Sequence, residues 1–191
     1  MSDKYLTKGS KRVATHSRGN DVFLLEPAGR MAVGTLFGIA VFLDILAVVM
    51  LVTGGVFTIG TVIGLLVILS VSSLFFLFAV AQRSSRIVLN EQELHLQVPL
   101  YGRRIPLASI NSSQARPVNN LASSPYQLKW RRNGLGVPGY SLGWFSSQGK
   151  GRILASVTTS RALAIPTRDD YTLLVSAKDP DALTRRLREL A

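Results

Sequence analysis

Cysteine is absent from all 191 residues of the chain. Its absence excludes a disulfide framework, thiolate zinc sites and cysteine nucleophiles. Histidine is scarce too: only His16 and His95 occur, and two histidines without cysteine are a poor set of metal ligands. Neither histidine belongs to an identifiable triad with a carboxylate and a nucleophile. We therefore expect no metal, no cofactor and no enzymatic activity.

Charge is missing from one long stretch of the chain. No charged residue occurs between Asp44 and Arg83, although the net charge is +11, from 22 Lys and Arg against 11 Asp and Glu. Sixteen of the Lys and Arg lie from Arg83 onward. Because apolar and charged residues are separated along the chain, we expect a membrane-embedded part followed by a small polar domain.

Two apolar segments fill the uncharged region, at about residues 31–53 and 56–81. Each has about the 20 residues that a helix needs to cross a bilayer. Thr53, Gly54 and Gly55 separate the segments with room for only a tight turn. A cleaved signal peptide is disfavoured, because about thirty residues precede the first segment and a second follows at once. The sequence predicts a basic tail (1–30), a transmembrane hairpin (31–82) and a domain (83–191).

The basic residues around the hairpin predict its orientation. Six Lys and Arg precede the first segment, Arg83 and Arg86 follow the second, and the connecting turn has none. Positively charged flanks stay on the cytoplasmic side of a membrane. We therefore expect both termini and the domain after the hairpin to be cytoplasmic.

The hairpin contains one carboxylate and two pairs of glycines that are candidate contacts with a partner in the membrane. A carboxylate such as Asp44 is energetically unfavourable in hydrocarbon, which indicates a functional role, such as pairing with a cationic or polar group of a partner helix. The alternative is that Asp44 is protonated, or hydrogen-bonded to a hydroxyl such as that of Thr58 or Ser70. A proton pathway is disfavoured, because one carboxylate and two helices cannot form a relay. Small residues four apart let helices approach closely, within the hairpin or against another protein. These pairs are Gly34 with Gly38, and Gly60 with Gly64.

The chain after Arg83 has the pattern of short strands. Leu94, Leu96 and Val98 alternate with polar residues, and similar short runs recur to residue 175. Residues 127–132 are compatible with a strand or a helix. Asp179 and Pro180 then begin a final amphipathic helix. This pattern predicts a curved sheet or partial barrel of about seven strands, capped by a C-terminal helix.

Several motifs of this domain resemble the bacterial pleckstrin-homology (PH) domain family over about residues 86–190. They are GLGVPGY at 134–140, GWF at 143–145, Val157-Thr158, IPT at 165–167, YTLL at 171–174 and the helix start at 176–183. Asp170 stands where the family has glycine, and residues 159–162 replace a more acidic turn. The resemblance implies an α+β membrane protein of bacterial inner (cytoplasmic) or internal membranes, and it implies architecture more than activity.

Two motifs of this domain contain residue types that occur in binding sites. The glycine-rich segment 134–139 lacks the spacing of a phosphate-binding loop, and Pro138 removes an N–H donor. Lys129, Trp130, Arg131 and Arg132, next to Tyr126, form the densest basic and aromatic cluster. That cluster is a candidate face for a lipid headgroup or a protein partner, or simply a solvated basic strand. A membrane-tethered domain explains the positive charge more simply than nucleic-acid binding does.

These patterns favour a non-enzymatic accessory, scaffold or assembly subunit of a larger membrane complex. Its partners would be other integral membrane proteins. The alternative is a sensor of anionic lipid headgroups that uses the cluster at residues 129–132.

Overall fold

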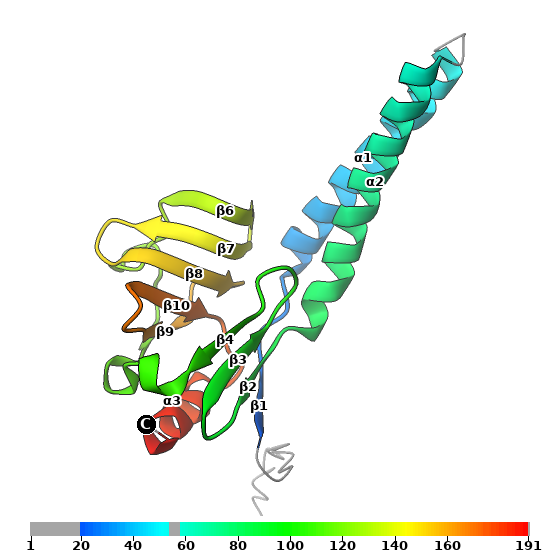
Figure 1. Cartoon of the computed structure of the whole chain (residues 1–191). Coiled ribbons are helices and arrows are strands. Elements are labelled where there is room, and N and C mark those ends of the chain that lie inside the picture. Colours follow the sequence, from blue (N-terminus) through cyan, green and yellow to red (C-terminus); the bar gives the residue numbers. More distant parts are fainter. Residues whose placement is uncertain (1–19, 54–57, 191) are drawn as a thin grey trace, which may run out of the picture.

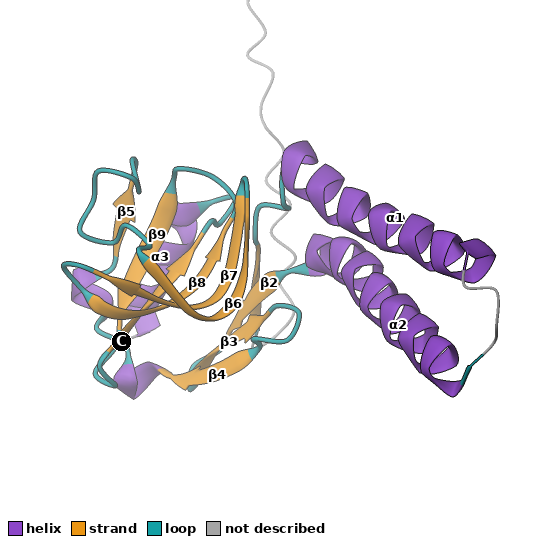
Figure 2. Cartoon of the chain, turned by 90° about the horizontal axis from the view of Figure 1, so that it is seen from above, coloured by secondary structure: helices purple, strands orange, loops and turns teal. Residues whose placement is uncertain are grey.

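The computed structural model describes residues 20–53 and 58–190. Two long helices, α1 (Arg30–Thr53) and α2 (Ile59–Ala81), lie side by side and extend away from a domain of strands (Figures 1 and 2). Their bounds agree with the expected segments to within three residues. The turn expected at residues 53–55 lies, apart from Thr53, outside the described residues. The side-chain oxygen of Thr58 caps the start of α2 by accepting a hydrogen bond from the Thr61 N–H.

The first sheet is antiparallel, with strands in the order β1-β2-β3-β4. Its strands are β1 (Asp21–Leu24), β2 (Arg86–Leu89), β3 (Glu93–Gln97) and β4 (Arg103–Pro106). The predicted alternation of β3 is confirmed, since Leu94 and Leu96 are fully buried and His95 and Gln97 are not. A short 3-10 turn (Gln82–Ser84) joins α2 to β2.

Strand β1 corrects the expected extent of the N-terminal tail. Residues 1–30 were expected to be a basic tail, yet residues 21–24 pair with β2, with Asp21 opposite Leu89. The helical hairpin is thus inserted between two neighbouring strands of one sheet. Four residues are too short for a strand to be recognised by alternation, and the partner strand follows only after the hairpin. Residues 1–19 of the expected tail lie outside the described residues.

The second sheet has the order β5-β9-β10-β8-β7-β6, and only β8 and β10 run parallel. Its strands are β5 (Arg116–Val118), β6 (Trp130–Val137), β7 (Tyr140–Ser147), β8 (Gly151–Val157), β9 (Ala162–Pro166) and β10 (Tyr171–Val175). After Arg83 the described residues thus contain nine strands, β2 to β10, rather than about seven. Besides β1, two strands do not follow from the sequence pattern: β5 contains Pro117, and β6 is ambiguous because asparagine and glycines weaken its strand pattern.

Two glycines let β6 and β7 approach closely. Gly134 lies opposite Gly143, and both have positive φ, +147° and +116°. A Cβ on Gly134 would collide with the Leu142 carbonyl oxygen, and one on Gly143 with the Asn133 carbonyl oxygen. In the glycine-rich segment that carried the family resemblance, Gly134 is therefore required by this close approach of the two backbones.

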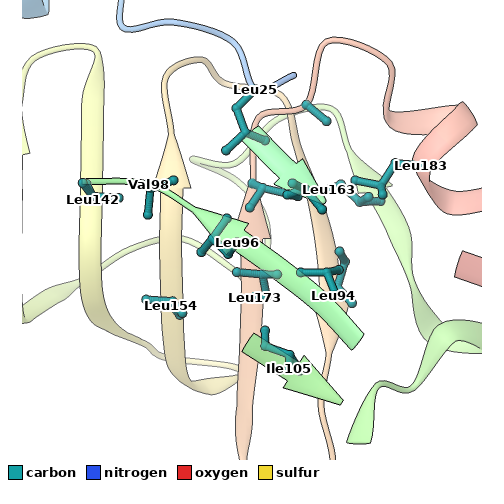
Figure 3. Packing of buried hydrophobic residues seen from close by; sticks show 14 of the residues in the cluster. Leu25, Leu94, Leu96, Val98, Ile105, Leu142, Leu154, Leu163, Leu173 and Leu183 are labelled. Carbon is teal, nitrogen blue, oxygen red and sulfur yellow. The ribbon is translucent and has the colours of Figure 1, made fainter. Parts of the chain in front are cut away.

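The hydrophobic core lies between the two sheets and is closed by α3 (Pro180–Leu190) (Figure 3). Leu96 of β3, Leu173 of β10 and Leu183 of α3 are each fully buried there. The helix begins as expected, because the Asp179 side chain accepts a hydrogen bond from the Ala182 N–H at 2.9 Å. Asp170, which replaces the family's glycine, has a φ of +57°, a conformation that aspartate tolerates better than most residues.

Candidate interaction surfaces

The base of the helical hairpin is fixed to the sheet domain by buried hydrogen bonds. Gln82 is only 2% exposed, and its Oε1 accepts a hydrogen bond from the Ala28 N–H at 2.7 Å. Its Nε2 donates to the Ala79 carbonyl oxygen at 3.2 Å. The Leu25 N–H donates to the Ser85 carbonyl oxygen at 3.1 Å. The segment that enters α1 is therefore bonded to the segment that leaves α2.

One face of α1 packs against α2. Ala32, Leu36 and Ala40 are buried at four-residue spacing along this face. The Ser72 hydroxyl of α2 donates to the Ala40 carbonyl oxygen at 3.3 Å, so the two backbones are close at this level. The contact is narrow, because only 17% of each apolar span is buried within the protein.

The glycine pairs of the two helices have different surroundings. On α1, a Cβ added at Gly34 or Gly38 would meet no atom of the described residues within 4 Å, so both face away from α2. On α2, a Cβ at Gly64 would lie 3.2 Å from the Met50 methyl group, within the hairpin. A Cβ at Gly60 would lie 3.7 Å from the hydroxyl oxygen of Thr58, and no other described residue comes within 4 Å of it. Of the four glycines, Gly64 lies at the contact between the helices, and Gly34 and Gly38 lie on the open side of α1.

Asp44 is exposed on α1 and makes no hydrogen bond to any described residue. The two hydroxyls considered as partners are engaged elsewhere. The Ser70 hydroxyl donates to the Leu66 carbonyl oxygen at 2.7 Å, and Thr58 pairs with Thr61 at 3.0 Å. The structure therefore does not show the intrachain hydrogen bond that would explain this carboxylate.

Gly34, Gly38, Val41 and Ile45 are exposed at the spacing of one helical stripe, and Asp44 borders it. We call these five residues the outer face of α1. The outer face combines small residues, which permit close helix contact, with one ionisable group.

The basic cluster predicted from the sequence lies on and just before β6, an edge strand of the second sheet (Figure 1). We call Lys129, Trp130, Arg131 and Arg132 the basic edge. All four are exposed, Trp130 to 77%, and none forms a salt bridge with a described residue. Tyr126 does not belong to this surface, because it is 2% exposed and packs in the smaller core cluster.

A second group of basic and aromatic residues was missed by the sequence analysis. The Arg103 guanidinium carbon lies 5.6 Å from the Trp144 ring centroid and 5.2 Å from that of Tyr171. Arg152 lies 5.5 Å from the same Trp144 ring. These residues come from β4, β7, β8 and β10, so no local spacing could have brought them together. Both guanidiniums are held by cation–π contacts, and neither forms a salt bridge with a described residue.

Two buried tyrosines have raised pKa values. Burial raises the pKa of Tyr140 far above its ordinary value of 10.0, and burial also raises that of Tyr171, an effect that the nearby Arg103 charge opposes. Both hydroxyls lack a hydrogen-bond partner among the described residues. Phenols with raised pKa values stay neutral at physiological pH, which makes them packing groups and poor proton donors.

The two sheets and the capping helix α3 have the architecture of a PH-like domain. Residues 85–191 match the family model described as Bacterial PH domain, and the chain belongs to that family. No curated protein and no solved structure matches the chain. The matched region begins just before β2, so β1 and both long helices lie outside it, although β1 completes the first sheet. Within the described residues, no three His, Asp or Glu side chains are grouped as metal ligands.

Proposed function

We propose that this protein is a membrane-anchored, non-enzymatic PH-like accessory or assembly subunit of a larger membrane complex. Its helices α1 and α2 insert as a hairpin into a bacterial inner or internal membrane. Both are long and apolar enough to cross a bilayer, and most of their surface is not covered by the rest of the protein. Contiguous apolar surface of that extent is rarely left to water, so hydrocarbon is its natural surrounding.

The proposed orientation puts both termini and the PH domain in the cytoplasm. Arg30 lies at the start of α1, and Arg83 and Arg86 follow the end of α2. Basic residues at these ends favour the cytoplasmic side. Because the hairpin is joined to β1 at one end and β2 at the other, the domain is held at the membrane surface in a set orientation.

The outer face of α1 is the observation that carries the assignment as a subunit. Asp44 has no hydrogen-bond partner among the described residues, and an isolated carboxylate in hydrocarbon is unfavourable by about 2.5–3.5 kcal/mol on insertion scales. Gly34 and Gly38, about two to three turns nearer the start of α1, leave space for close approach of a second helix. A partner helix that packs on these glycines and offers Asp44 a cationic or hydroxyl group satisfies both features.

The test is affinity purification of the tagged full chain from native membranes in mild detergent, with mass spectrometry. We expect a stoichiometric integral membrane partner with the wild type, and its loss or strong reduction with Asp44→Ala. Ser70→Ala is the matched control, because Ser70 is a polar residue of α2 that bonds only its own helix backbone. Recovery of the wild type without any membrane protein would overturn the proposal.

A second candidate function is the binding of anionic lipid headgroups, and the basic edge favours it. Lys129, Arg131 and Arg132 are exposed without salt bridges to described residues, and Trp130 is suited to the membrane interface. In this function the same anchored domain would sense the charge of the bilayer surface. The charge-reversal experiment in the Discussion separates it from the subunit proposal.

A further inference from the structure

The loop between β3 and β4 has an apolar tip that lies beside the lower end of α2 (Figure 1). Residues 98–102 are Val-Pro-Leu-Tyr-Gly and carry no charge. Val98 is buried and Tyr101 partly buried, so the base of the loop packs into the domain. Leu100 between them is 75% exposed, which leaves a large apolar side chain without packing in the described part of the protein.

The backbone of Leu100 is held in an unfavourable conformation. Its φ is +62°, and the Tyr101 N–H donates to the Pro99 carbonyl oxygen at 2.7 Å, which is the pattern of a classic γ-turn. The Tyr101 hydroxyl donates to Oδ1 of Asn133 at 2.9 Å and holds the loop against β6. A strained turn that is enforced by its surroundings, and that presents an unpacked leucine, points to a contact made by that leucine.

An apolar groove of about 190 Å³ separates this loop from α2. Leu74, Phe75 and Phe78 of α2 form one wall, and Leu100 and Tyr101 of the loop form the other. Leu74 lies about 10 Å along the helix from its end at Ala81, so the groove extends onto the apolar span itself. Among the residues that the structure describes, no charged side chain lines the groove.

We propose that the β3–β4 loop inserts into the membrane leaflet next to the domain, with Leu100 among the acyl chains and one lipid acyl chain in the groove. This inference rests on the proposed insertion of α1 and α2. Lipid is the fitting occupant because the wall formed by α2 is continuous with the helix surface that would face hydrocarbon. Arg103 and Arg104 directly follow the loop. With the apolar loop in the hydrocarbon, these two basic residues would lie at the level of the lipid headgroups.

Insertion of the loop gives the domain a third contact with the bilayer, after the two helices. Two adjacent helices alone allow the hairpin, and the domain fixed to it, to tilt together relative to the bilayer. A third contact to one side of α2 removes that freedom and fixes which surfaces of the domain are turned toward the membrane.

The absence of cysteine makes a direct test possible. Leu100→Cys is spin-labelled in the full chain and reconstituted in vesicles of phosphatidylcholine and phosphatidylglycerol, and its collision rates with oxygen and with a water-soluble nickel chelate are compared. Leu66→Cys on the exposed surface of α2 is the control for hydrocarbon. Gln114→Cys, exposed beside α3, is the control for water.

We expect the label at position 100, like the label at position 66, to favour oxygen over the nickel chelate, with a lower ratio because position 66 lies farther along α2 from the domain. A ratio like that at position 114 would overturn loop insertion while leaving the helical anchor intact. A label at 100 that is immobilised and shielded from both reagents would also overturn it, since a protein would then cover the groove. A water-exposed label at position 66 would overturn the anchor and the loop insertion together.

Discussion

The backbone N–H of Ala28 donates a hydrogen bond to the side-chain Oε1 of Gln82 over 2.7 Å, and both groups are buried. One residue lies just before α1 and the other just after α2, so this bond closes the base of the hairpin. It joins the anchor to the domain through a buried contact, and a hinge at this position would break it. An orientation imposed in this way is what a subunit needs when its domain must face a fixed neighbour.

Replacing Gln82 by alanine should destabilise the protein by about 1–3 kcal/mol, because the buried Ala28 N–H is left without an acceptor. The measurement is the free energy of unfolding of the full chain in detergent, by denaturant titration. Gln92→Ala, at an exposed position, should change it by less than about 0.5 kcal/mol. Equal effects of the two substitutions would contradict the role assigned to Gln82.

Gly143→Ala should destabilise the domain by about 3 kcal/mol or more, because the added Cβ meets the opposing strand at Asn133 and φ is +116°. Gly136→Ala is the matched control on the neighbouring strand. Its added Cβ would lie 4.0 Å from the Phe145 ring, and it has no strained φ, so little change is expected. Thermal unfolding followed by tryptophan fluorescence distinguishes the two. A Gly143→Ala protein as stable as Gly136→Ala would show that β6 and β7 are not this close.

Elements that are determined by residues close together in the sequence could be predicted, and elements that depend on contacts between distant segments could not. The helices follow from an uninterrupted apolar composition, and α3 from the cap at Asp179. Strand β1 could not be recognised, because its partner β2 follows only after the whole hairpin. The contact of Arg103 with Trp144 depends on how the two sheets pack.

The candidate interaction residues divide in the same way. Their chemistry was visible in the sequence, as a carboxylate and glycines in an apolar segment. The direction in which these residues point could not be predicted from the sequence. Whether Gly34 faces α2 or the membrane depends on which face of α1 packs against α2. That face is set by Ala32, Leu36 and Ala40, and their pattern is hidden in a helix that is apolar all round.

The stability of the domain should fall at alkaline pH. Tyr140 has a pKa raised by burial, so it keeps its proton in the folded state when the unfolded chain has already lost it above its ordinary pKa of 10.0. Its contribution is therefore complete below pH 10 and declines as pH rises further. Tyr140→Phe should make the profile of unfolding free energy between pH 8 and 11 flatter.

Tyr140→Phe should not destabilise the protein at neutral pH, because its buried hydroxyl has no hydrogen-bond partner among the described residues. A loss of more than about 1 kcal/mol at pH 7 would mean that the hydroxyl is bonded after all. An unchanged alkaline decline would mean that another group is responsible for it.

Charge reversal of the basic edge separates the two candidate functions. We expect the double variant Arg131→Glu, Arg132→Glu to retain its membrane partner in affinity purification, because the proposed contact lies on α1. Arg161→Glu, Lys178→Glu is the control with the same change in net charge at exposed positions elsewhere. The opposite result has two parts. The wild type would carry no protein partner but bind anionic lipid selectively in nanodiscs, and the Arg131→Glu, Arg132→Glu variant, unlike its control, would lose that selectivity. Headgroup binding would then replace the subunit function.

Photo-crosslinking in native membranes shows whether the outer face of α1 contacts another membrane protein. A photoreactive amino acid is placed at Val41 on the outer face, and in a separate variant at Leu69 on the exposed surface of α2. We expect one discrete crosslinked product with a membrane protein from position 41, and only lipid adducts from position 69. Lipid adducts alone from position 41, at an expression level where the domain is folded, would contradict it.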